Sequence, residues 1–183
     1  LPGLAFRTGF RWNEKAAGFI HLHPAPPRID TDSPRIGNHT MKWNLDAAPW
    51  TTAAGEWLVV GFTKSLDQDP HWGLLDTALQ GQLSRLRESR DLTGKLGELL
   101  PIHDVPGLTA QRLLLIGLGN KEKLQRPAIL KALTIAARHI STRENQTVAL
   151  AVPADVSGKI TSETVRISLE AFLVGSLGQD VLR

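Results

Sequence analysis

The chain has 183 residues, of which 42% are hydrophobic and 21% charged, as in an ordinary soluble globular protein. This composition argues against a disordered chain, a collagen and a coiled coil. Because the chain has no Cys, disulfides, thiolate metal sites and cysteine nucleophiles are excluded, which fits a reducing cytoplasm. No apolar run approaches the roughly 18 residues of a membrane span, so no membrane partner is expected.

The formal net charge of +3 is distributed unevenly along the chain. Residues 1–40 hold five Lys and Arg against three Asp and Glu, whereas residues 41–183 hold sixteen against fifteen. Strong nonspecific DNA-binding proteins carry a larger positive excess on the folded domain. The overall charge is therefore weak support for a nucleic-acid partner.

The first 40 residues also differ from the remainder in composition. They hold five of the 11 prolines and three of the six histidines, and the stretch from His23 to His39 has no sustained helical or strand period. Met41, the one methionine, precedes a regular globular pattern. We therefore predict an N-terminal extension over residues 1–40 and a domain over residues 41–183. The sequence leaves open whether the extension is a linker, an upstream segment or a gene-start error.

Apolar runs and helical stripes predict alternating strands and helices along residues 41–183. Asp69 and Pro70 are placed to begin the first helix, and Pro101 predicts an edge position for its strand. Continuous apolar strands between helices predict an α/β fold, a three-layer α/β/α sandwich around a mostly parallel mixed sheet. Strands are predicted at residues 42–47, 56–63, 99–103, 112–117 and 147–152, and helices at 69–86, 127–141 and 162–175.

Helical spacing predicts which side chains of each helix face the core. Ser162 is predicted to cap the last helix. Trp43, Trp50, Trp57 and Trp72 are expected near one edge of the sheet or at an interface, with core packing favoured for Trp57. The inward residues are Leu74, Leu75, Ala78, Leu79, Leu83 and Leu86 in the first helix, Ile129, Leu130, Leu133, Ala136, Ala137 and Ile140 in the second, and Val165, Leu169, Phe172 and Leu173 in the last.

A glycine-containing segment after the strongest strand is a candidate anion or nucleotide site, because N–H groups at a helix start point toward anions. Its residues are Gly117, Leu118, Gly119, Asn120 and Lys121. The third glycine of a dinucleotide fingerprint is missing, since Glu122 stands at its place, and no P-loop motif is present. The favoured alternative is a strand end whose tight turn requires glycine.

The histidines and serines supply no recognisable catalytic set. His21, His23 and His39 could bind a metal, but a solvated extension is the favoured interpretation because zinc needs a better-defined ligand set. There is no GxSxG motif, and His103 and His139 lack an acid partner in the sequence. His139 is placed to interact with the C-terminal end of its helix instead.

A basic helix face is a candidate nucleic-acid surface. Lys131 and Arg138 are seven residues apart and share this face, and Arg143 follows. Such faces are more often simply solvated, and no aromatic residues interleave with the basic ones as base stacking requires.

Several segments in a fixed order resemble the N-terminal domain of the cytosolic leucine aminopeptidases. They are EWLVVG at 56–61, LDTALQGQL at 75–83, DLTGKLGE at 91–98, RLLLIGLG at 112–119, AILKALTIAAR at 128–138 and VALAVP at 148–153. The last helix is similar to the linker helix of that family, with Ala171 and Ser176 where Gly and Tyr are usual. The resemblance covers about residues 42–178.

The resemblance implies a macrodomain-like fold and places the peptidase chemistry in a separate C-terminal domain. There, two divalent ions (Zn or Mn) are held by Lys, Asp and Glu, including an NTDAEGR-type segment that this chain does not contain. No catalytic residue, metal ligand or cofactor is therefore expected in this chain, which alone is not expected to be an enzyme. Its parent would be a metal-dependent aminopeptidase that releases N-terminal amino acids from peptides. The implied partners are its own catalytic domain, further copies in a hexamer and, in some bacterial members, DNA.

Two kinds of function follow from these observations. The first is a noncatalytic assembly or regulatory domain of a cytoplasmic two-metal leucyl aminopeptidase. The second is a stand-alone macrodomain-like module that binds a nucleotide or ADP-ribose near Gly117–Lys121, or DNA through its basic faces. An independent enzyme is least supported, because no nucleophile, acid and base stand together in the sequence.

Overall fold

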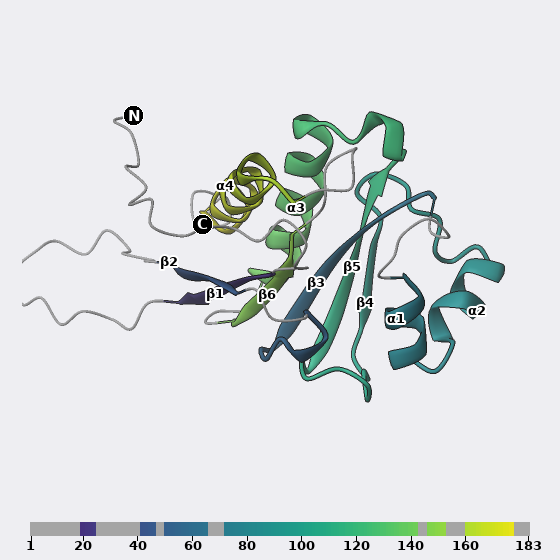
Figure 1. The fold of residues 1–183 in the computed structure, drawn as a ribbon. Helices are drawn as coiled ribbons and strands as arrows, with labels where there is room; N and C mark the ends of the chain where they lie inside the picture. The colour runs from purple at the N-terminus through teal and green to yellow at the C-terminus, as the bar shows by residue number, and fades with distance from the viewer. Residues whose placement is uncertain are drawn as a thin grey trace, which may run out of the picture.

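The computed structural model describes residues 19–24, 41–46, 50–65, 72–142, 146–152 and 160–177. Within these ranges a mixed sheet is covered by helices on both faces, which confirms the predicted three-layer α/β/α sandwich (Figure 1). Helices α3 (Arg126–Ile140) and α4 (Ser162–Leu177) cover one face. Helices α1 (Trp72–Ala78) and α2 (Gln82–Glu88) cover the other. None of the described helices is long and apolar enough to cross a membrane.

The described strands form one six-stranded sheet in the order β2-β1-β6-β3-β5-β4. β6, β3 and β5 run parallel, β1 is antiparallel to both of its neighbours, and β4 is antiparallel to β5. Only β1 and β4 of these strands therefore oppose the common direction, as expected for a mostly parallel mixed sheet. The strands are β1 Phe19–Pro24, β2 Met41–Asp46, β3 Trp57–Thr63, β4 Leu99–Ile102, β5 Arg112–Gly119 and β6 Val148–Ala151.

Strand β1 comes from the predicted N-terminal extension. Phe19 is paired with Ala151 of β6 on one side and with Asp46 of β2 on the other. The sheet therefore includes residues from both sides of Met41, and the division into an extension over residues 1–40 and a domain over residues 41–183 stays a prediction. Pro101 lies in β4 at the outer edge of the sheet, as predicted, where a missing N–H breaks no ladder bond.

The predicted first helix is two short helices. Gln80 and Gly81 both have positive φ, at 54° and 75°, and such residues cannot continue a right-handed helix. Asp76 caps the second helix from the first, because its Oδ1 accepts the Ser84 N–H at 3.0 Å. Within α1 the buried side chain is Leu75, whereas Leu74 is 61% exposed, so the predicted core position of Leu74 is wrong. Asp69 and Pro70, the predicted helix start, lie outside the described residues.

Helix α3 agrees with its prediction, whereas the inner face of α4 is rotated from the predicted one. In α4 the fully buried side chains include Ile167, Ser168 and Phe172, while Leu173 is 43% exposed.

The N-terminal cap of α4 is also one residue earlier than predicted. Thr161, not Ser162, accepts the Thr164 N–H at 3.2 Å, and Thr164 Oγ1 accepts the Thr161 N–H at 2.9 Å. This reciprocal pair is a capping box and fixes where α4 begins.

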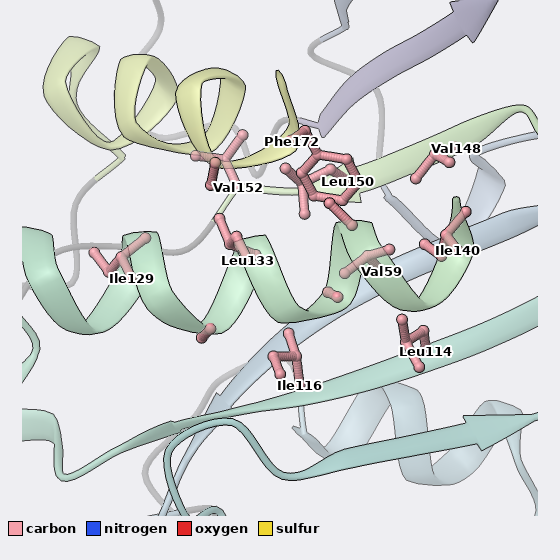
Figure 2. Packing of buried hydrophobic residues seen from close by; sticks show 14 of the residues in the cluster. Val59, Leu114, Ile116, Ile129, Leu133, Ile140, Val148, Leu150, Val152 and Phe172 are labelled. Atoms are coloured by element: carbon pink, nitrogen blue, oxygen red, sulfur yellow. The ribbon is translucent and has the colours of Figure 1, made fainter. Parts of the chain in front are cut away.

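The core has one part on each side of the sheet, because neighbouring residues of a buried strand point to opposite faces. Val59, Leu114 and Ile116 point toward α3 in Figure 2. Leu58 and Leu115 belong to the cluster on the α1–α2 side.

Trp57 is buried as predicted, and its indole Nε1–H donates to Gln146 Oε1 at 3.2 Å. The sheet is thus enclosed around its central strands, and a binding surface has to lie at its edges or on the helices.

Candidate functional site

The carboxyl ends of the parallel strands β3 and β5 lie beside one loop, residues 93–98, which leads into β4. Edges of this kind are where open α/β sheets bind ligands. Gly117, Leu118 and Gly119 are the last residues of β5, two residues beyond the predicted strand end at Gly117. Asn120 and the short 3-10 helix η3 (Lys121–Lys123) follow. The predicted anion segment is therefore part strand and part helical turn, with the Leu118 side chain buried.

The glycines of this edge allow the loop to lie directly on β5. A Cβ on Gly117 would come within 2.0 Å of the Lys95 carbonyl oxygen. A Cβ on Gly94, whose φ is +73°, would come within 2.8 Å of the Lys64 backbone nitrogen. The Gly119 φ of +82° likewise requires a residue without a side chain. Both glycine-containing motifs thus serve one close contact between the loop and the strand.

The Glu98 carboxylate holds the same loop closed. It accepts the Thr93 N–H at 3.0 Å, the Thr93 hydroxyl at 2.8 Å and the Lys95 N–H at 3.0 Å. Charge-assisted bonds of this kind are stronger than bonds between neutral groups. Glu98 was not singled out from the sequence as a site residue, although its place after Gly94 and Gly97 was a signal that could have found it.

The backbone amides that an anion would need at the two glycines are already bonded. The Gly117 N–H donates to the Glu98 carbonyl at 2.8 Å, and the Gly119 N–H donates to the Gly94 carbonyl at 3.0 Å. An anion at this edge would therefore have to be held by groups at Asn120 and Lys121. The anion or nucleotide site stays a prediction.

The predicted nucleic-acid residues are partly described. Lys131 and Arg138 are both exposed on α3, seven residues apart as expected. Arg143 lies outside the described residues. The structure therefore brings two of the three onto one helix, and a role in nucleic-acid binding stays a prediction.

The described histidines do not come together in one site. His103 and His139 both contact the Trp57 ring edge-on, with ring centroids 5.9 and 6.1 Å away. Only the backbone of His21 and His23 is described, in β1, and His39 lies outside the described residues. Among the side chains that the structure describes, no three His, Asp or Glu lie close enough together to hold a metal ion.

An ion-pair network ties the start of α3 to α4. The Arg126 guanidinium contacts Glu163 at 3.0 Å and Glu170 at 2.7 Å, and Arg166 contacts Glu163 at 2.7 Å. The hydrogen bond from Arg166 is the largest cause that holds the pKa of the Glu163 carboxyl below its ordinary value; burial opposes it, and the hydrogen bond from Arg126 adds to the lowering. The hydrogen bond to Glu163 and the charge of Glu170 raise the pKa of Arg126. These partners are 37 and 44 residues apart, so no local sequence signal could have found the network.

Helix α4 keeps an apolar outer surface beyond this network. Leu173 and Val174 are 43% and 52% exposed, while their neighbour Phe172 is buried. The other large exposed hydrophobic side chains among the described residues are Leu74 on α1 and Leu96 at the tip of the 93–98 loop. Adjacent exposed apolar side chains on a fixed helix are typical of contact surfaces.

A groove of about 410 Å³ lies between the edge strand β4 and helix α2. Its lining is apolar where Leu86, Leu100 and Ile102 face it, and polar where Arg85 and Asp104 face it. Arg85 is partly engaged, since its Nη1 donates to the Gln80 carbonyl at 3.1 Å. The groove lining includes His103 and Asp104 but no Ser, Thr or Cys that could act as a nucleophile.

Comparison with known proteins gives one consistent family. The model of the cytosol aminopeptidase family, N-terminal domain, matches residues 59–183. Relatives named probable cytosol aminopeptidase include those of Xanthomonas oryzae pv. oryzae, 34% identical over 102 residues, and Stenotrophomonas maltophilia, 40% identical over 86 residues. These alignments cover 56% and 47% of this chain but only 21% and 18% of the relatives. The aligned part of the chain thus spans about a fifth of the length of the relatives that it matches.

Proposed function

Because the chain belongs to the cytosol aminopeptidase family through its N-terminal domain, we propose that it is the noncatalytic N-terminal domain of a longer two-metal leucyl aminopeptidase. The full-length enzyme would release N-terminal amino acids from peptides, and this domain would support its assembly and limit access to its active site. The support is the family match over residues 59–183 together with the small share of each relative that the chain covers. The comparisons do not favour the alternative of a stand-alone nucleotide, ADP-ribose or DNA module.

The observation that carries an assembly role is the outer surface of α4. This helix is fixed to the body by its buried face and by the ion pairs of Arg126, yet it exposes Leu173 and Val174 side by side. Covering both side chains would remove apolar surface from water, at about 25 cal/mol per Å². In a longer polypeptide, the catalytic domain or a second copy would cover them.

The metal ions of the proposed parent would belong to that catalytic domain. The described residues of this chain do not fit a pair of divalent ions, because they offer no cluster of three His, Asp or Glu. A cytoplasmic location is proposed from the chain's lack of Cys and from its relatives, which are named cytosol aminopeptidases. Assembly into a homo-oligomer is part of the proposed function. DNA binding through Lys131, Arg138 and Arg143 is not part of it and stays a prediction.

The test has a genetic and a biophysical arm. Sequencing the gene beyond the Arg183 codon is expected to show a reading frame with an NTDAEGR-type segment. In the longer protein, the double substitution Leu173→Asp, Val174→Asp is expected to reduce the assembled mass measured by light scattering. Leu74→Asp is the matched control, because Leu74 is 61% exposed on α1, a helix that covers the opposite face of the sheet (Figure 1). A reading frame without such a segment, or an unchanged mass, would contradict the proposal.

A further inference from the structure

Four lysines and one leucine form an exposed patch at the carboxyl end of β3 and β5, here called the lysine shelf. Its residues are Lys64, Lys95, Leu96, Lys121 and Lys123, of which Lys121 is half-buried and the other four are exposed. They come from three segments that the backbone brings together. Lys64 follows β3, and its N–H donates to the Gly119 carbonyl at 2.9 Å, while η3 with Lys121 and Lys123 begins two residues after Gly119. The 93–98 loop brings Lys95 and Leu96 onto the same edge, because it lies directly against Gly117 and Gly119.

The positive charge of the shelf is not balanced within the described residues. None of its four lysines forms an ion pair there. Two carboxylates stand among them. Glu98 is already bonded to Thr93 and to the Lys95 N–H, and Glu122 is exposed within η3. The shelf therefore keeps an excess of positive charge facing solvent.

Leu96 is the apolar member of the shelf. Its side chain is 40% exposed at the tip of the 93–98 loop. The loop is held on both sides of Leu96, by Glu98 and by the hydrogen bond from the Gly97 N–H to the Gly117 carbonyl at 2.8 Å. A side chain presented by a loop that is already ordered loses little conformational entropy when a partner covers it.

We propose that the lysine shelf binds an acidic protein segment that carries an apolar side chain over Leu96. Carboxylates of the segment would face the lysines and speed its association, while burial of Leu96 would slow its release. A nucleic acid is the less suitable partner. The shelf has no aromatic side chain on which a base could stack, and phosphate contacts would leave Leu96 exposed. The proposal does not depend on the identity of the parent enzyme.

The test measures the binding of a fluorescent peptide, Glu-Glu-Leu-Glu-Glu, to the 183-residue chain by anisotropy at low and high salt. Binding is expected to weaken as salt rises, because salt screens exposed charges. Lys64→Glu with Lys95→Glu is expected to weaken binding roughly tenfold or more. Lys121→Glu with Lys123→Glu is a second variant for the case that the first does not fold. Lys131→Glu is the matched control, because it reverses one exposed lysine charge on α3 and should leave binding unchanged.

Two further probes separate an acidic protein segment from other anions. The peptide Glu-Glu-Ser-Glu-Glu and the variant Leu96→Ser should each bind more weakly than the original pair, because both remove the apolar contact. A 20-base-pair DNA duplex should compete poorly. Equal binding by the Ser peptide, strong competition by DNA, or full binding by a folded shelf variant would each overturn the proposal.

Discussion

Gly117 and Gly94 determine how the loop of residues 93–98 meets β5. The sequence alone favoured a glycine-dependent strand end over an anion site, and the observed contacts supply the physical reason for that preference. The Gly117 backbone lies against the Lys95 carbonyl, and Gly94 lies against Lys64 with a positive φ. A glycine-rich strand end therefore need not indicate phosphate, because close approach of two backbones requires the same residue.

Gly117→Ala is expected to destabilise the chain by about 1–3 kcal/mol, as overpacking of a fixed backbone contact usually does. The added Cβ would lie 2.0 Å from the Lys95 carbonyl oxygen, which is backbone and cannot rotate away. Gly73→Ala is the control, because nothing lies within 4 Å of its added Cβ inside α1, where Ala is the better helix former. Urea unfolding of the two variants should shift the midpoint in opposite directions. A Gly117→Ala variant as stable as the original chain would contradict the observed contact.

Glu98→Gln tests the closure of the same loop. The amide retains one acceptor oxygen but turns an NH₂ toward N–H groups that now donate to a carboxylate, so a loss of about 1–3 kcal/mol is expected. Glu88→Gln on the exposed end of α2 should change stability little. Hydrogen exchange should also show faster exchange at the Thr93 and Lys95 amides in Glu98→Gln alone. Unchanged exchange at both amides would contradict the assigned role of Glu98.

At the scale of elements, the spacing of apolar residues predicts the bounds and the buried face of one helix correctly but not those of the others. Helix α3 follows its apolar stripe closely, because 15 residues of consistent spacing leave one inward face. The stripe before Leu86 is equally regular, but Gln80 and Gly81 leave the helical region and divide it. Helix α4 is apolar on more than one side, so spacing alone did not separate Phe172 from Leu173.

Phe172→Ala and Leu173→Ala should therefore differ sharply although the residues are adjacent. Truncating buried Phe172 is expected to cost about 3–5 kcal/mol, because it leaves a cavity between α4 and the sheet. Truncating exposed Leu173 should change the free energy of unfolding by less than about 0.5 kcal/mol. Comparable losses in chemical denaturation would mean that the face of α4 has been assigned wrongly.

The network that holds α4 predicts a dependence on pH. Because the folded-state pKa of Glu163 is lowered from its ordinary value of 4.5, its stabilising contribution is fully present above that value. The contribution is lost as the pH falls through the lower, folded-state pKa. The difference in melting temperature between the original chain and Glu163→Gln should therefore be positive near neutral pH and shrink on acidification below 4.5. A Glu163 difference that stays constant at all pH values would exclude the lowered pKa.

For the whole molecule, the sequence predicts the three layers correctly but does not predict every strand of the sheet. Runs such as Arg112–Gly119 are long and apolar enough to mark central strands, and Pro101 marks an edge. β1 was not predicted because it ends at Pro24 within the proline-containing segment, and its partners β2 and β6 are distant in sequence. Long-range pairing of this kind leaves no local pattern.

The candidate surfaces were less accessible to prediction than the fold. Lys121 and Gly119 were noticed as part of one segment, but Lys64 and Lys95 join them only through contacts between separate strands and loops. The exposure of Leu173 and Leu96 likewise depends on packing that the sequence pattern does not specify. The family resemblance could be stated from ordered motifs, and the match over residues 59–183 confirms it.

The most direct measurement is an aminopeptidase assay of the 183-residue chain with leucine p-nitroanilide, with and without added Zn²⁺ or Mn²⁺. A noncatalytic N-terminal domain should release no p-nitroaniline beyond the rate of the metal solution alone. Preparation in the presence of a chelator, followed by metal addition, controls for contaminating peptidases. Metal-dependent turnover that elutes with the chain and persists after this control would contradict the proposed role.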